Sequence, residues 1–98
     1  MISLEEIVST VSAYKNVPVE IVVSPTHENH IADCRHIISK IAKEVGYSLN
    51  QTGKILGKRN HSTIHKGIKK AEALIETDKY FRNDYLQIVK VIDDKQGI

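Results

Sequence analysis

The side chains best suited to bind a charged partner are concentrated between positions 45 and 71. This span contains no Asp or Glu, although the whole chain carries 12 acidic and 14 basic residues. Six of the basic residues fall inside it, which leaves the rest of the chain acidic, and such a local basic patch favours contact with nucleic acid. The side chains that could reach phosphates or base edges are Lys54, Lys58, Arg59, Asn60, His61, Ser62, Thr63, His65 and Lys66.

The same span reads as two helices joined by a tight turn. Ser48 opens a capping-box pattern for the first helix, and Gly57 supplies the left-handed conformation that ends it. Asn60 or Ser62 can cap the second helix by accepting a backbone hydrogen bond. The pattern predicts a helix-turn-helix at about 48–76, whose second helix enters the major groove of DNA.

The remaining chain must position this motif, and its patterning is helical throughout. One amphipathic helix is expected from Ser3 to about Tyr14–Asn16, and a last helix is capped by Thr77-Asp78. A short helix is expected over Val19–Val23, with a β-strand as the alternative because that run is β-branched. We expect the tail at 93–98 to fray.

A long helix from about His30 to Val45 carries the clearest amphipathic stripe. Arg35, Lys40 and Lys43 are expected to lie off this stripe. The last helix carries a second apolar stripe at helical spacing. The stripe residues are Ile31, Cys34, Ile38, Ile41, Ala42 and Val45 in the long helix, and Phe81, Tyr85, Ile88 and Ile92 in the last.

Length and composition predict a single all-α domain of about six helices over residues 1–98. Hydrophobic residues make up 41% of the 98, which is typical of a globular protein. The single cysteine excludes an internal disulfide and favours a reducing, cytoplasmic location. The sequence has neither an apolar run of membrane-spanning length nor a signal-peptide pattern.

Several of these residues together resemble the C-terminal DNA-binding domain of the bacterial replication initiator DnaA. The family signature reads aromatic-Gly-Gly-Arg-Asp-His-[Ser/Thr]-Thr-Val, and the chain has Leu56-Gly57-Lys58-Arg59-Asn60-His61-Ser62-Thr63-Ile64. Further matches are Arg35, Ile41-Ala42-Lys43-Glu44, Ser48-Leu49, Gly53 and Lys70. The resemblance covers nearly the whole chain and implies a Trp-repressor-like fold that binds double-stranded DNA at short asymmetric boxes.

The resemblance also implies roles for individual residues. His61, Ser62 and Thr63 stand where the family contacts bases and phosphates in the major groove. Arg35 matches an arginine that reads the major groove, Lys43 matches a phosphate-contacting lysine, and Arg59 matches the signature arginine. Asn60 replaces the family's Asp; it can accept from cytosine as Asp does, and its amide can also pair with adenine.

Three departures from the family predict a divergent site. The loop Pro25–His30 has neither Arg nor Lys, whereas the family's loop is basic and enters the minor groove. Glu28 would repel phosphate, Asp33 stands near where the family is basic, and Asn50 takes the family's common Pro position. We therefore expect a DnaA-box-like site with altered base preference.

Other functions are weighed against DNA binding. The main alternative is a protein-interaction module that kept the fold and lost specific DNA binding. The absence of Arg and Lys from the loop and the low net charge of the chain support it. His61 and His65 have zinc-compatible spacing, but three or four converging ligands are needed, so we expect no metal. The sequence shows no nucleophile–base pair, so we do not expect an enzyme. It also shows no cofactor loop, because Gly53–Lys58 is one residue short of a phosphate-binding loop, and we therefore expect no cofactor. Any ATPase would come from another domain or protein, and the chain is either an excised domain or, as we favour, a stand-alone protein.

Overall fold

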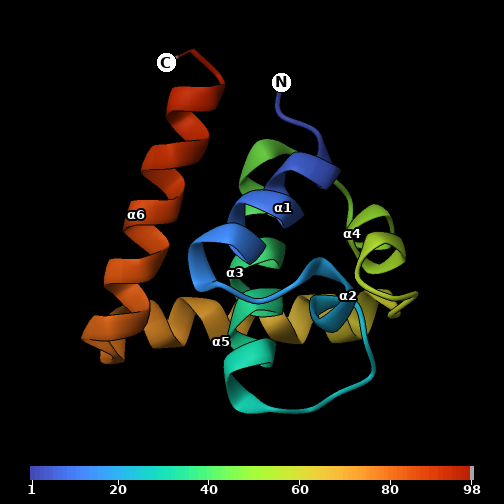
Figure 1. Cartoon of the computed structure of the whole chain (residues 1–98). Helices are drawn as coiled ribbons and strands as arrows, with labels where there is room; N and C mark the ends of the chain where they lie inside the picture. The colour runs from blue at the N-terminus through green and yellow to red at the C-terminus, as the bar shows by residue number, and fades with distance from the viewer. Residues whose placement is uncertain (98) are drawn as a thin grey trace.

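The computed structural model describes residues 1–97, which form six helices and no strand (Figure 1). The all-α prediction is therefore confirmed. The helices are α1 Leu4–Lys15, α2 Val19–Val22, α3 Asn29–Val45, α4 Leu49–Ile55, α5 His61–Thr77 and α6 Lys79–Lys95. The run at 19–22 is helical, so the alternative of a β-strand there is wrong.

Polar side chains at the helix starts explain where the helices begin. Ser3 Oγ accepts from Glu6 N, and Ser48 forms the predicted capping box with Gln51. Of the two candidate caps for α5, Asn60 is the one used, because its side chain accepts from Thr63 N. Each cap satisfies a backbone N–H that has no partner inside the helix.

The C-terminal part of α6 is ordered by contacts with the N-terminal segment. The helix continues to Lys95, so the prediction that the chain frays from residue 93 is wrong for residues 93–95; Gln96 and Gly97 form a turn beyond the helix, and Ile98 lies outside the described residues. Ile2 N donates to Gln96 Oε1 at 3.1 Å, and Lys95 Nζ donates to Thr10 Oγ1 at 2.8 Å. These bonds hold the last turn of α6 against the start of the chain.

Helix α3 is central and is covered by α1, α5 and α6 (Figure 1). Its predicted stripe is buried apart from Val45, which is half-buried, and Ile37 is buried as well. The stripe of α6 is also buried. Together these apolar faces form one hydrophobic core, whose burial is the main stabilising contribution.

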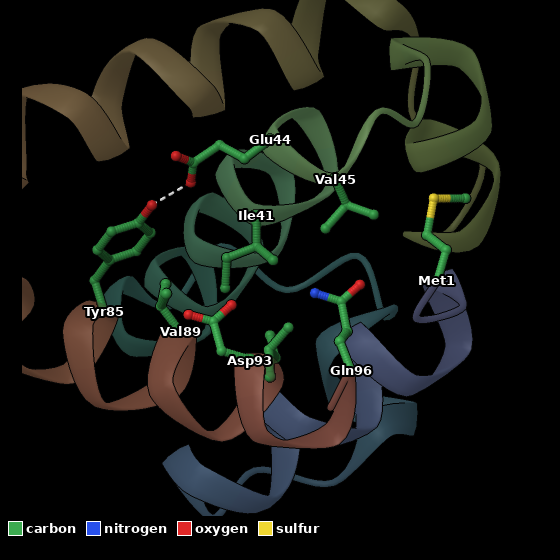
Figure 2. A pocket seen from close by; sticks show the side chains of 9 residues that line it. Met1, Ile41, Glu44, Val45, Tyr85, Val89, Asp93 and Gln96 are labelled. Atoms are coloured by element: carbon green, nitrogen blue, oxygen red, sulfur yellow. Dashed lines mark hydrogen bonds between the residues drawn. The ribbon is translucent and has the colours of Figure 1, made fainter. Parts of the chain in front are cut away.

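A cavity of about 370 Å³ lies between α3, α6 and Met1 (Figure 2). Tyr85 donates a hydrogen bond to Glu44 at its wall. Burial, followed by this hydrogen bond, raises the pKa of the Tyr85 phenol. Tyr85 therefore stays protonated and ties α6 to the C-terminal end of α3.

Candidate nucleic-acid interface

The first turn of α5 presents a group of exposed polar side chains. His61, Ser62 and Thr63 are all exposed, whereas Ile64, one position further along, is buried against the core. Asn60 Oδ1 accepts two hydrogen bonds from Thr63, one from the backbone N at 2.9 Å and one from Oγ1 at 3.1 Å. The helix start is thus rigid, and its outer face is open to a ligand.

The turn before α5 is packed directly on α4. A Cβ added at Gly53 would lie 2.1 Å from the backbone O of Arg59, and Arg59 N donates to Gly53 O at 2.9 Å. Gly57 has a φ of +88°, and an added Cβ there would meet the backbone O of Val23 at 2.4 Å. Only glycine allows both approaches, so Gly53 lets the turn close on α4 and Gly57 lets it close on Val23.

Arg35 is buried, so the expectation that it lies off the apolar stripe is wrong. Its side chain is 8% exposed and donates to three backbone carbonyls in the segment before α3. These bonds run from Nε to Val22 O at 2.7 Å, from Nη1 to Thr26 O at 2.8 Å, and from Nη2 to Ser24 O at 2.6 Å. In this conformation Arg35 holds the loop at 23–28 to α3; a contact between Arg35 and DNA stays a prediction.

Arg59 binds the same loop from the other side. Its Nη2 donates to Ser24 O at 2.8 Å, so two guanidinium groups share one carbonyl oxygen. Burial, followed by the charge of Arg59, lowers the pKa of Arg35. The two arginines join α3, the loop at 23–28 and the helix-turn-helix into one unit.

A small cavity of about 190 Å³ lies beside this arginine pair, between α3 and the start of α5. Its lining includes Arg35, Arg59, His27 and Thr63. The loop, through His27, and the first turn of α5, through Thr63, therefore border the same cavity. Within residues 1–97, the buried Nε of Arg59 makes no hydrogen bond. Two guanidinium groups therefore border this cavity at the edge of the exposed helix start.

The remaining predicted residues are placed on two parts of the surface. Lys54, Lys58, His65 and Lys66 are exposed on α4, the turn and α5, around the exposed start of α5. Lys43 is exposed near the end of α3 and interacts electrostatically with Glu72. Because Glu72 stands 11 residues beyond His61 on α5, Lys43 lies roughly 16 Å further along that helix.

Sequence reasoning missed the role of the loop carbonyls. Arg35 stands four residues after Ile31 and beside Cys34, so its place at the edge of the buried stripe was a usable signal. Nothing in the sequence indicates that the carbonyls of Val22, Ser24 and Thr26 would converge on it. That arrangement depends on how the loop folds back over α3.

Two further properties follow from the described part of the chain. Within residues 1–97, no three His, Cys, Asp or Glu side chains converge as metal ligands would. No helix in that part has the length and apolar character needed to cross a bilayer.

Comparison with known proteins gives a consistent family assignment. Residues 4–71 match the family described as bacterial dnaA protein helix-turn-helix. The chain is 29% identical over 92 residues to the chromosomal replication initiator protein DnaA of Acinetobacter baylyi, covering 93% of this chain and 20% of that protein. It is 32% identical over 92 residues to the DnaA protein of Acinetobacter baumannii strain AYE, with the same coverage. The chain thus spans about a fifth of the length of the curated relatives it matches.

Proposed function

Because this chain belongs to the bacterial DnaA helix-turn-helix family, we propose that it binds double-stranded DNA sequence-specifically through α4 and α5. The process it serves is replication initiation or its regulation. It acts as a non-catalytic, cofactor-free DNA-binding domain of the nucleoid. Any ATPase needed is supplied by another domain or protein.

One observation carries the proposal: the start of α5 is exposed, polar and free of acidic side chains. His61, Ser62 and Thr63 are at a helix N-terminus, where the backbone N–H groups and the helix dipole favour phosphate. Ile64 and Ile68 bury the opposite face of α5 on the core. The exposed face can therefore enter a major groove without breaking core contacts.

The residues divide into two roles. His61, Ser62 and Thr63 contact base edges and nearby phosphates, with the Thr63 methyl available for a thymine methyl. The exposed lysines Lys54, Lys58 and Lys66 neutralise backbone phosphates and fix the register of the protein on the duplex. Lys43 contacts a phosphate further along the duplex.

The loop before α3 supports our expectation that the base preference of the DNA site differs from that of the family. Glu28 and His30 are exposed, with 3.8 Å between Glu28 Oε2 and His30 Nδ1. The segment therefore presents a carboxylate where the family has basic side chains. Arg35 and Arg59 are bonded to the loop carbonyls and hold this segment beside α5. We expect weak minor-groove contact, and therefore most of the base readout in the major groove.

Fluorescence anisotropy tests the proposal, using a labelled duplex that carries a DnaA-type box and a scrambled duplex across a salt series. Binding should prefer the box, and affinity should fall steeply with salt, with each phosphate contact adding about 0.9 to the slope of log K against log salt. His61→Ala should weaken box binding by about 1–3 kcal/mol.

A pair of charge-matched variants separates the interface from the rest of the surface. Lys54→Gln should lower the salt slope by about 0.9, because it removes one phosphate contact. Lys90→Gln removes the same charge from the exposed face of α6 and should leave the slope unchanged. Weak binding that is equal on both duplexes and insensitive to Lys54→Gln, with no site enriched from random duplexes, would favour the protein-interaction alternative.

A further inference from the structure

The cap of α5 determines which hydrogen-bonding groups Asn60 can offer to a base. Thr63 N is a backbone donor, so the Asn60 atom that faces it at 2.9 Å must be the carbonyl oxygen Oδ1. The Thr63 hydroxyl also donates to Oδ1, at 3.1 Å. An amide oxygen has two lone pairs, and both are therefore engaged inside the protein.

The other polar atom of this side chain is free. Asn60 is exposed, and within residues 1–97 its Nδ2 donates no hydrogen bond. Asn60 thus meets solvent, or a ligand, as a donor with two N–H groups. The pairing with adenine that the sequence suggested needs Oδ1 and Nδ2 together, and the cap removes Oδ1 from that pairing.

Given the proposed DNA binding, on which this inference rests, we infer that Asn60 is a specificity-determining residue that selects guanine at one position of the site. Guanine presents two neighbouring acceptors, N7 and O6, to the major groove, which match the two N–H groups of Nδ2. Cytosine presents the N4 amino donor and would face donor against donor. Adenine offers the single acceptor N7 beside its own amino group.

The family's Asp at this place gives the opposite preference by the same geometry. An Asp can cap the helix with one carboxylate oxygen and still offer the other as an acceptor, which suits the N4 amino group of cytosine. Exchanging one NH2 group for one oxygen therefore reverses the hydrogen-bonding character at this position. The turn that carries Asn60 is held by the bond from Arg59 to Ser24 O, so the reversal occurs on a fixed backbone.

The matched variant is Asn60→Asp, because Asn and Asp are about equally good caps and have the same shape. Selection from a random duplex library, followed by anisotropy on the selected site with each of the four bases at the variable position, should be run on both proteins. The unchanged chain should prefer guanine over cytosine there by at least about fivefold, and Asn60→Asp should reverse that preference at this position alone. Thermal unfolding of the two proteins should agree within a few degrees, which checks that the cap is intact.

The outcomes distinguish this inference from the proposed function. A selected site at which both proteins prefer the same base at every position, or at which the unchanged chain prefers cytosine or adenine at the position that responds to Asn60, would overturn the inference and leave DNA binding in place. Selection of no site by either protein would overturn both. Because each preference is a ratio within one protein, the added negative charge of Asn60→Asp, which lowers affinity for every duplex, does not affect the comparison.

Discussion

Gly53→Ala should destabilise the protein, although helix propensity alone favours the change. Gly53 is inside α4, where Ala would contribute about 1 kcal/mol more helix stability than Gly. The added Cβ, however, would lie 2.1 Å from the backbone O of Arg59. This oxygen belongs to the turn, not to a flexible side chain, so the turn itself must move away.

The magnitude follows from the contacts that this movement breaks. Overpacking of this kind costs about 3 kcal/mol, and the 2.9 Å bond from Arg59 N to Gly53 O, which contributes about 1 kcal/mol, is lost with it. After the propensity gain, the free energy of unfolding should fall by about 3 kcal/mol. For a domain of this size that corresponds to a decrease in Tm of roughly 12–24 °C.

Urea denaturation followed by circular dichroism measures the free energy directly. The matched control is Gly67→Ala, the other glycine inside a helix, where the nearest atom to the added Cβ is His36 Nδ1 at 3.2 Å, on a side chain that can move. We expect Gly67→Ala to change stability by less than about 1 kcal/mol, because propensity and crowding nearly cancel. A Gly53→Ala protein as stable as the unchanged chain, or more stable, would refute the proposed packing of the turn on α4.

Three further predictions concern titratable side chains that are buried wholly or in part. Cys34 is fully buried and burial chiefly raises its pKa, so a thiol reagent should modify it in the folded protein only as fast as the protein unfolds; complete reaction on mixing would contradict this. Burial lowers the pKa of His36 from its ordinary 6.5, so stability should fall as pH drops below that value, and pH-dependent denaturation should show this loss reduced in His36→Gln. Burial, and then Glu44, raise the pKa of Tyr85 above its ordinary 10.0. The contribution of Tyr85 to the free energy of unfolding is therefore fully present below pH 10 and is lost as the pH rises above that value. Tyr85→Phe should cost about 1 kcal/mol at neutral pH and flatten that alkaline loss, and an unchanged alkaline limb would count against the Tyr85–Glu44 contact.

Features that depend on neighbouring residues were predictable from the sequence. Ser3 and Ser48 cap their helices through the third residue along, and α3 ends at Val45 as predicted, followed by Gly46 with a φ of +116°. The stripe of α6 is buried as its helical spacing predicted. These features are local, and each is set by a few side chains within one or two turns.

Features that depend on distant backbone atoms were not predictable. Arg35 and Arg59 meet at Ser24 O although they are 24 positions apart, and no spacing rule links an arginine to a particular carbonyl. The end of α6 was expected to fray because nothing in its own sequence shows that Ile2 would donate to Gln96. For the interface, the sequence indicated which side chains are polar and basic, whereas only the fold shows that Arg35 is buried and that the cap occupies Asn60 Oδ1.

The contact between the first and last helices has a consequence for protein synthesis. Helix α1 is bonded to α6 through Lys15 Nζ to Asp84 Oδ2 at 2.7 Å and through Lys95 Nζ to Thr10 Oγ1 at 2.8 Å. Of the six described helices α1 emerges from the ribosome before the others, and its contacts with α6 form only once α6 has been made. The interval in which this nascent chain is open to proteases and chaperones therefore lasts until the end of α6 has left the ribosome, even though α4 and α5 have emerged earlier.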